Sequence, residues 1–403
     1  MKKNIFVETV DQYCANNYHP LDVVLSHGYG IWVYDNQGKK YMDFLSGYSA
    51  INQGHCNREI IKIIKKQINE ITLTSRAFHN NQLGLFAKEL CQLTNFEMML
   101  PMNTGAEAVE TAIKVARKWG QYKKGVKINK GEIIVCKNNF HGRTVTIISF
   151  STENQYRDGF GPYTKGFKIV KFNNLKAIKK AINLNTIAIL MEPIQAEGGI
   201  LIPDKGYLTA VANICQKNNI LFILDEIQTG LGRTGKLFAY EHDYNAKPDL
   251  LVIGKALGGG FYPVSAVLSS KEIFEVIKPG DHGSTFGGNP LASAIARKSL
   301  QVIVNEKLVE NSAQLGAYFL NKLKTLKSKW IKEIRGKGLL IGVELYENAG
   351  GARRYCEALM KEALLCKETH ENVIRFAPPL IIKKKEIDFA FNKIKKVLEN
   401  SKL

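Results

Sequence analysis

The chain has 403 residues, of which 45% are hydrophobic and 23% are charged, and its formal net charge is +19. The length exceeds that of one ordinary hydrophobic core, so we expect one large and one smaller domain, and the composition is typical of a folded, soluble protein. The charge alone would suit a nucleic-acid-binding protein, which remains the alternative outside the enzymes. The lysines are scattered without interleaved aromatic residues, however, as in KIIKKQ (62–67), and we therefore expect no nucleic-acid partner.

The cysteines and the first residues bear on the cellular compartment. The seven cysteines are odd in number, widely spaced and without a CxxC motif, which argues against a disulfide framework and against a zinc site. The start, MKKNIFVETVDQYC (1–14), lacks a long apolar core, and no apolar run approaches the length that spans a bilayer. We therefore expect a cytoplasmic protein with reduced thiols, no membrane partner and no metal.

The segment NTGAEAVETAIKVARKWG (103–120) is predicted to be a helix. Thr104 and Glu107 have the spacing of a capping box, apolar residues recur at helical intervals, and Gly120 is the expected end. The positive end of this helix would present backbone N–H groups at Gly105 and Ala106, and such a site suits a phosphate. The alternative is a well-capped core helix without a ligand.

Five short apolar runs follow, and each is predicted to be a strand. They are continuous rather than alternating, which indicates that the strands are buried on both faces. Such strands are typical of a mainly parallel sheet covered by helices, and one of these helices is predicted at 206–217. The fold class is therefore α/β. The runs are EIIVC (132–136), IAILME (187–192), ILFILDE (220–226), DLLVIGK (249–255) and PVSAVLS (263–269).

The pattern changes after residue 290, where we expect the smaller α/β domain. A long helical stretch (291–323) is followed by RGKGLLIGVEL (335–345), predicted as one strand, and by a last helix from about Lys384. The predicted division is an N-terminal segment that packs with the small domain, a large ligand-binding domain and a small domain, covering residues 1–45, 46–290 and 291–403.

Polar residues directly follow the predicted parallel strands, where such sheets bind ligands. They are Glu192, Asp225 with Glu226, and Lys255. A buried aspartate requires a cation or several donors, and a protonated ring nitrogen would serve, although Asp225 could equally be a satisfied structural residue. A partly desolvated Lys255 would become an amine nucleophile able to form a Schiff base, whereas the alternative is a solvated loop lysine.

These three features together indicate one cofactor. A phosphate site, an aspartate for a pyridinium nitrogen and a lysine that forms a Schiff base are the binding features of pyridoxal 5′-phosphate. Each feature alone is a weak signal. The loop DEIQTGLGRTGK (225–236), which is rich in glycine and basic residues, also favours a ligand at this edge of the sheet.

The sequence resembles the class III aminotransferases, a family of fold-type I pyridoxal-phosphate enzymes, and within it the members that act on ornithine. The resemblance covers nearly the whole chain, and several of its blocks are long and specific. The blocks are NNYHPLDVVL (16–25), FLSGYSAINQGHC (44–56), MNTGAEAVETAIK (102–114), NNFHGRT (138–144), LDEIQTGLGRTGK (224–236), IGKALGGGFYPVSAVL (253–268), HGSTFGGNPL (282–291) and VIRFAPPL (373–380).

The resemblance implies roles for the cofactor-binding residues. Lys255 would hold the cofactor as a Schiff base and then move the proton, while Asp225 would keep the ring nitrogen protonated. Ser284 and Thr285 would reach the phosphate of the neighbouring subunit, so a homodimer with shared active sites is expected. The remaining contacts would be Phe140 stacked on the ring, Gln228 near the 3′-oxygen, and Gly105 with Ala106 at the phosphate.

The resemblance also implies a substrate pair. Arg143 and Arg375 can each bind a carboxylate in bidentate fashion, which fits 2-oxoglutarate. An unpaired arginine would repel the terminal amine of ornithine, and Glu197 would neutralise Arg375 until 2-oxoglutarate displaces it. For these charges the alternative is an ordinary structural ion pair. Tyr18 and Tyr48 match tyrosines that contact the α-amino and α-carboxylate end of ornithine.

The activity that follows is an expectation with near alternatives. L-ornithine and 2-oxoglutarate would give glutamate 5-semialdehyde, which cyclises to pyrroline-5-carboxylate, and glutamate. The same cofactor core serves acetylornithine and 4-aminobutyrate aminotransferases, other ω-amino transaminases and glutamate-1-semialdehyde aminomutase, and a cofactor-binding protein without turnover is a further alternative. The chain departs from the family pattern in QAEGG (195–199), in the glycines after KAL (255–257), and at Gly47, which leaves the functional side chains in place.

Overall fold

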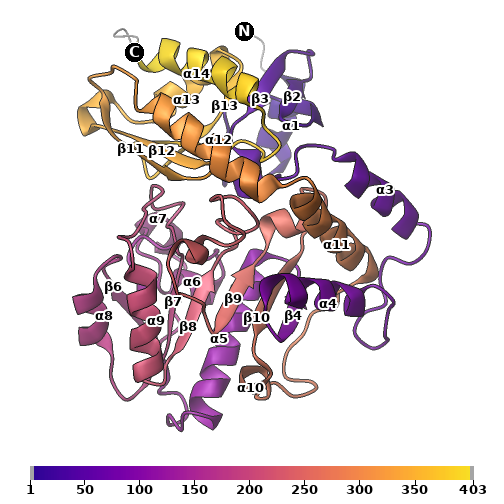
Figure 1. Cartoon of the computed structure of the whole chain (residues 1–403), viewed down its shortest axis with the longest axis vertical. Helices are drawn as coiled ribbons and strands as arrows, with labels where there is room; N and C mark the ends of the chain where they lie inside the picture. Colours follow the sequence, from indigo (N-terminus) through magenta and orange to yellow (C-terminus); the bar gives the residue numbers. More distant parts are fainter. Residues whose placement is uncertain (1–3, 400–403) are drawn as a thin grey trace.

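The computed structural model describes residues 4–399, and a seven-stranded sheet forms the centre of its larger part (Figure 1). The strands at one side of the sheet are parallel, whereas β10 runs antiparallel to both of its neighbours. The prediction of a mainly parallel α/β sheet is confirmed. The strand order is β4 (Met98–Met102), β10 (Ser265–Ser269), β9 (Leu250–Ile253), β8 (Leu221–Asp225), β7 (Thr186–Met191), β5 (Glu132–Cys136) and β6 (Phe167–Val170).

All five predicted strands are present, and two strands at the edges of the sheet were missed. Every residue of β7, β8, β9 and β10 is buried, which explains why their sequences are continuous apolar runs. The edge strands β4 and β6 are mostly half-buried or exposed. An edge strand needs apolar residues on fewer sides, so MMLPM and FKIV carry a weaker signal.

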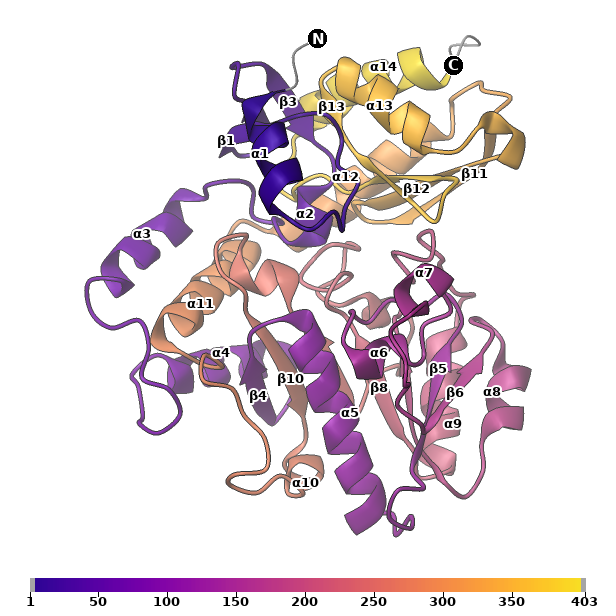
Figure 2. The same cartoon turned by 180° about the vertical axis from the view of Figure 1, so that it is seen from behind.

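Helices cover both faces of this sheet. The long helix α5 (Gly105–Tyr122) lies on one face, and α8 (Leu175–Ala181) and α9 (Tyr207–Lys217) lie on the other (Figures 1 and 2). The remaining helices of this part are α3 (Arg58–Gln67), α4 (Leu83–Thr94), α6 (Val145–Ile148), α7 (Asn154–Arg157), α10 (Lys271–Phe274) and two 3₁₀ segments, η1 (Ala239–His242) and η2 (Lys255–Gly258).

The capping box of α5 is confirmed, but its predicted end is wrong. Thr104 accepts from the backbone N–H of Glu107, and the Glu107 side chain accepts from the backbone N–H of Thr104. The helix continues past Gly120 to Tyr122. Gly120 serves packing, because a Cβ there would lie 2.3 Å from Cγ2 of Ile187 on β7.

A second, four-stranded antiparallel sheet forms the core of the C-terminal part. Its order is β11 (Ile331–Lys337), β12 (Leu340–Leu345), β15 (Val373–Phe376) and β14 (Lys367–Thr369). The prediction of one strand over 335–345 is wrong, because the chain reverses at Gly338, whose φ is +52°, and forms the β11–β12 hairpin.

One further correction concerns the helices that follow residue 290, of which the first packs against α3 and α4 of the larger part (Figure 1). The predicted helical stretch is two helices, α11 (Pro290–Asn305) and α12 (Leu308–Leu323), separated at Lys307, whose φ is +52°. The last helix, α14 (Lys384–Leu398), begins where it was predicted. Helix α13 (Arg353–Lys361) and the 3₁₀ segment η3 (Glu347–Ala349) were not expected from the sequence.

The N-terminal strands lie beside the C-terminal part of the chain (Figure 2). The strands β1 (Leu25–Tyr29), β2 (Trp32–Asp35) and β3 (Lys40–Asp43) form a sheet whose fourth strand, β13 (Leu364–Leu365), pairs in parallel with β3. Helix α1 (Ile5–Tyr13) precedes them, and the short turn α2 (Ser46–Ser49) follows them. The domain boundaries at residues 45 and 290 stay predictions.

Candidate active site

Three neighbouring strand ends place ionisable side chains around one cavity. Glu192 follows β7, Asp225 ends β8, and Lys255 begins the 3₁₀ segment after β9. The cavity has a volume of about 200 Å³. Its walls are Gly105, Ala106, Phe140, His141, Gly142, Glu192, Asp225, Ile227, Gln228, Thr229 and Lys255, so most of the predicted cofactor residues meet here.

Lys255 has the environment expected of an amine nucleophile. Burial lowers the pKa of its ammonium group to about 8, although the negative charges of Glu197 and Asp225 oppose this effect. In mildly alkaline solution, a substantial fraction of the molecules therefore carries Lys255 as a neutral amine. Its backbone has φ +45°, and the glycine-rich turn that follows includes Gly259 at φ +60°.

Asp225 is held by two donors at the bottom of the cavity. Its Oδ2 lies 2.7 Å from Nδ1 of His141, and its Oδ1 accepts from the backbone N–H of Ile227 at 3.0 Å. Burial would lower the pKa of His141, but the hydrogen bond and charge of Asp225 outweigh burial and raise it. Nε2 of His141 has no hydrogen-bond partner within residues 4–399.

His141 is a site residue that sequence reasoning missed. It stands in NNFHGRT (138–144), directly after Phe140, which was named for its ring. The signal that could have found it is a histidine in a motif next to a predicted strand end. Its contact with Asp225 joins residues 84 positions apart, so only the fold reveals the pair.

The start of α5 forms the wall expected to hold a phosphate. A Cβ at Gly105 would lie 3.0 Å from Cδ1 of Ile227, so a larger residue would crowd this wall. Ser284 lies beside the same helix start, because its Oγ accepts from the side chain of Asn103 at 2.7 Å. Thr285 is exposed. The expected reach of Ser284 and Thr285 to a neighbouring subunit stays a prediction.

A buried ion pair adjoins the cavity near Lys255. Nη2 of Arg375, a wholly buried residue, lies 2.7 Å from Oε1 of Glu197. Gln228 joins the pair by donating to Glu197 at 3.3 Å and accepting from Arg375. Burial would raise the pKa of Glu197, but the positive charges of Arg375 and Lys255 lower it below the ordinary value. The carboxylate form of Glu197 is therefore favoured beside Arg375.

The other predicted substrate residues lie around two aromatic clusters. The guanidinium carbon of Arg143 is 5.9 Å from the ring centre of Tyr18 and 4.3 Å from that of Tyr156, which sequence reasoning missed. The guanidinium carbon of Arg375 lies 5.2 Å from the ring centre of Tyr48. Arg143 and Tyr18 are exposed, so the two clusters differ in their access to solvent.

A left-handed turn holds Tyr48 in place. Ser46, Gly47, Tyr48 and Ser49 have φ values of 50°, 55°, 57° and 69°. Non-glycine residues in this region cost roughly 1–2 kcal/mol each. Two backbone N–H groups that donate to Oδ1 of Asp43, each at 2.8 Å, hold the entrance to the turn. Such strain gathers at functional sites.

Comparison with known proteins places the chain in a family. The model of the aminotransferase class-III family matches residues 13–398. The chain belongs to the class-III aminotransferases. The ornithine aminotransferase of Brevibacillus brevis is 54% identical over 98% of both chains, and that of Bacillus subtilis is 54% identical over 99% of both.

Solved structures of the family agree with this fold. A structure of the ornithine aminotransferase from Toxoplasma gondii is 41% identical, with a TM-score of 0.97, covering 99% of this chain and 95% of that one. The acetylornithine aminotransferase of Elizabethkingia anophelis is 44% identical, with a TM-score of 0.89 over 98% of both chains. The chain therefore has the fold-type I architecture and is a transaminase.

The residues around the cavity fit pyridoxal 5′-phosphate, the cofactor of the class-III family. His141, whose buried Nε2 has no hydrogen-bond partner among the described residues, lines the cavity, Asp225 is buried at a strand end, and burial lowers the pKa of the Lys255 amine. The helix start at Gly105 offers backbone N–H groups to an anion. Among the described residues no cluster of three or more histidine, cysteine, aspartate or glutamate side chains could hold a metal ion.

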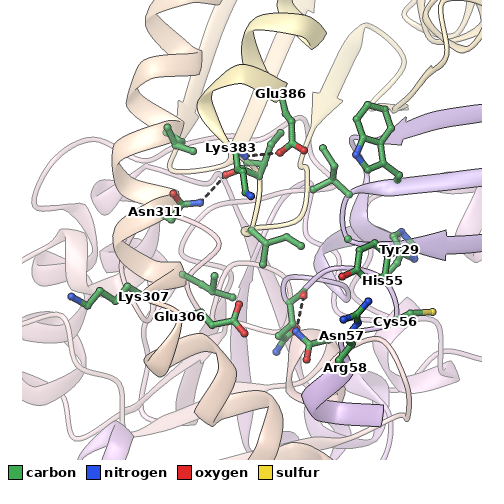
Figure 3. Close-up of a pocket in the computed structure, with 18 of the residues that line it drawn as sticks. Tyr29, His55, Cys56, Asn57, Arg58, Glu306, Lys307, Asn311, Lys383 and Glu386 are labelled. Atoms are coloured by element: carbon green, nitrogen blue, oxygen red, sulfur yellow. Dashed lines mark hydrogen bonds between the residues drawn. The ribbon is translucent and has the colours of Figure 1, made fainter. Parts of the chain in front are cut away.

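A larger cavity, of about 950 Å³, lies elsewhere in the molecule (Figure 3). It lies between the starts of α3, α12 and α14, and its walls carry charges of both signs, such as Arg58, Glu306 and Lys383. None of the predicted site residues lines it.

Across residues 4–399, no helix has the length and apolar character needed to cross a membrane.

Proposed function

We propose that this aminotransferase transfers the 5-amino group of L-ornithine to 2-oxoglutarate. The products are glutamate 5-semialdehyde, which cyclises to pyrroline-5-carboxylate, and glutamate. The observation that carries this proposal is the 2.7 Å ion pair between Glu197 and Arg375 at the cavity. While the pair is closed, the guanidinium charge is neutralised, and an approaching ammonium group meets no net positive charge.

The residues of the chain divide the work at the cofactor. Bound pyridoxal 5′-phosphate supplies an electron sink for the carbon that loses its proton. Lys255 would hold the cofactor, and its amine, with a pKa of about 8, suits a group that both takes and returns a proton. Asp225, which is oriented by His141, would bind the ring nitrogen, and Phe140 would hold the ring.

The two substrates use the same charges differently. Tyr18 and Tyr48 contact the α-amino and α-carboxylate end of ornithine, so that the far amine points toward Lys255. When 2-oxoglutarate enters, one carboxylate binds Arg143, and the other displaces Glu197 from Arg375. A bidentate arginine–carboxylate contact of this kind provides both orientation and affinity.

The assembly and location belong to the same proposal. The protein acts as a homodimer in the cytoplasm, with Ser284 and Thr285 contributing to the partner's phosphate site. The exposed position of Thr285, with the neighbouring Phe286 46% exposed, supports a further surface that covers this loop. Residues 46–290 serve as the cofactor-binding domain, and residues 1–45 pack with the small domain of residues 291–403.

Absorbance of the cofactor-loaded protein tests the substrate. Ornithine, acetylornithine and 4-aminobutyrate are added separately, without a keto acid. Conversion of the bound cofactor to its amino form by ornithine, far better than by the other two, is the expected result. The likeness to an acetylornithine aminotransferase makes acetylornithine the second candidate, and a preference for it would move the activity within the family.

Three further experiments test the role of the tyrosines, the attachment of the cofactor and the nucleic-acid alternative. Tyr18→Phe and Tyr48→Phe are expected to widen the preference toward acetylornithine and 4-aminobutyrate, and unchanged selectivity in both would refute their assigned role. Borohydride reduction should fix the cofactor to Lys255, which a binding protein that uses another residue would not show. Salt-sensitive binding to random DNA, which we expect to be weak, tests the nucleic-acid alternative.

A further inference from the structure

Two carboxyl groups stand side by side at the cofactor cavity. The strands β7 and β8 are parallel and pair Met191 with Leu224, so the next residues, Glu192 and Asp225, leave the sheet as neighbours. Both side chains are buried, with 5% and 4% exposure, and both line the cavity. Two carboxylates this close in a poorly solvated place are not ionised together at low cost, so their environments assign different protonation states.

The contacts show which of the two carries the charge. Asp225 is matched by His141 and by the N–H of Ile227, and both contacts favour a carboxylate. Glu192 contacts the backbone of Phe140, whose N–H donates to its Oε2 at 3.0 Å. A carbonyl oxygen of a neutral carboxyl group accepts that hydrogen bond as well as a carboxylate does.

Burial and the surrounding charges together determine the pKa of Glu192. Burial raises the pKa of Glu192 to about 8, the positive charge of His141 opposes this, and the negative charge of Asp225 adds to it. The side chain is therefore mainly protonated near neutral pH. The ionisable groups that interact with it, from the strands and loops packed around it, are Cys136, His141, Glu197, Asp225 and Lys255.

We propose that Glu192 is a positioning residue, whose neutral carboxyl group fixes the backbone of Phe140 so that its ring covers the cofactor. This proposal rests on the proposed function only in its use of pyridoxal 5′-phosphate. The effect extends along the cavity wall, because the Phe140 ring contacts that of Tyr156, with centres 6.0 Å apart, and Tyr156 lies under Arg143. A neutral Glu192 also leaves the negative charge beside the ring nitrogen to Asp225.

Three variants distinguish a need for the hydrogen-bond acceptor of Glu192 from a need for a negative charge. Glu192→Gln keeps the acceptor and stays neutral at every pH, whereas Glu192→Ala removes the acceptor. Glu226→Gln is the matched control, because Glu226 is equally buried at the end of the neighbouring strand β8, has a pKa raised by burial to about 7, and bonds Thr229 and the backbone of Tyr240 rather than Phe140.

The first measurement is the dissociation constant of pyridoxal 5′-phosphate for each apoprotein, together with the circular dichroism of the bound cofactor. We expect Glu192→Gln to bind within about threefold of the unmodified protein and to keep the dichroic band, since the acceptor remains. Glu192→Ala should bind roughly tenfold more weakly and lose much of the band. Equal losses in the glutamine and alanine variants would show that a charged carboxylate is required and would overturn the proposal, as would an unchanged alanine variant.

The second measurement is infrared spectroscopy of the apoprotein between about pH 6 and about pH 10. A carbonyl band of a protonated carboxylic acid should disappear as the pH rises. This band should be missing from Glu192→Gln and retained in Glu226→Gln; an identical set of bands in Glu192→Gln and the unmodified protein would refute a neutral Glu192. If the unmodified protein binds no pyridoxal phosphate, the proposed function fails, whereas normal binding with the wrong variant pattern overturns this inference alone.

Discussion

At the scale of single residues, Glu197 and Arg375 form a charge pair that the proposed function requires to open for 2-oxoglutarate. Their contact is 2.7 Å long, Arg375 is wholly buried, and Gln228 bonds both partners. A buried arginine that loses its partner leaves an uncompensated charge, so the pair is stable until another carboxylate takes the place of Glu197. The same guanidinium can therefore serve an amine donor and a dicarboxylate acceptor in turn.

Replacing Glu197 with glutamine should separate the two half-reactions. With Arg375 no longer neutralised, kcat/KM for ornithine is expected to fall by about tenfold or more, while the KM for 2-oxoglutarate stays equal or decreases. Single-turnover kinetics with each substrate alone measure both effects. Asp388→Asn, which breaks the pair with Lys322 between α14 and α12, is the control and should change neither. Equal losses in both half-reactions would reduce Glu197 to a structural role.

The His141–Asp225 pair predicts a pH-dependent contribution to stability. The folded-state pKa of His141 is raised, so the contribution is fully present below the ordinary pKa of about 6.5 and is lost as pH rises through the folded value. His141→Gln should therefore lower the free energy of unfolding of the apoprotein by about 2 kcal/mol at acidic pH and by less at alkaline pH. Urea denaturation across this pH range measures the difference.

His282 supplies the control of opposite sign. Its pKa is lowered by burial and by the charge of Lys114, so its neutral form is favoured in the folded protein. The difference between the unmodified protein and His282→Gln should grow in favour of the unmodified protein as pH rises through the ordinary pKa. A His141 contribution that also grows with pH would contradict the assigned ion pair.

At the scale of elements, α5 shows what local sequence can and cannot predict. Its capping box is local, since Thr104 and Glu107 are three residues apart, and the prediction was confirmed. The predicted end at Gly120 was wrong, because that glycine is required by Ile187 on β7, 67 positions later in the chain. A glycine near a helix end therefore has two explanations that sequence alone does not separate.

Gly120→Ala tests this packing. The added Cβ would lie 2.3 Å from Cγ2 of Ile187, so the variant should be destabilised by about 2 kcal/mol despite the better helix propensity of alanine. Ile187→Ala removes the obstructing atom, and the double variant should lose less stability than the sum of the two single variants. Thermal unfolding of the four proteins completes the cycle, and strict additivity would contradict a direct clash.

The elements that were predicted wrongly share a physical cause. The single strand over 335–345 became a hairpin at Gly338, and the helical stretch over 291–323 divided at Lys307. Each break is one residue in the left-handed region. A lysine carries no sequence signal for that conformation, and the glycine at 338 did not distinguish a turn from a position inside a strand.

At the scale of the whole molecule, Arg233 joins three parts of the chain. It donates to the carbonyl of Leu339 at 2.9 Å, to that of Pro378 at 2.6 Å, and to the side chain of Asn52. The residue is fully buried, and burial lowers its pKa to about 9, although the charge of Asp43 opposes this. A cation is tolerated there because backbone carbonyls from the C-terminal part surround it.

Arg233→Met should therefore destabilise the protein by about 3 kcal/mol or more, because the carbonyl oxygens lose their donors together. The expected result is a lower midpoint of chemical denaturation for the whole protein, since the contacts link the N-terminal and C-terminal segments. Lys332→Met, which removes an exposed ion pair with Glu344, should change stability by less than about 1 kcal/mol. Similar losses in both variants would refute the role assigned to Arg233.

The candidate site was partly accessible from sequence. Asp225 and Lys255 follow apolar runs, and a parallel sheet brings such ends together, so their approach could be expected. His141 and Tyr156 stand in loops without periodicity, and their contacts with Asp225 and Arg143 join distant segments. The turn that places Tyr48 over Arg375 consists of residues with positive φ, of which only one is glycine.

Sequence alone therefore determined the α/β class, the central strands, the capped helix and the family, because these depend on local patterns: continuous apolar runs, capping spacing and contiguous motifs. Tertiary structure decided the protonation states and the partnerships. Burial raises the pKa of Glu192, and Asp225 on the neighbouring strand adds to that effect, whereas Arg375 is neutralised because a loop brings Glu197 to it. Burial and the distance between charges determine the pKa values and the strength of the ion pair. Both quantities are defined only once distant segments are packed together.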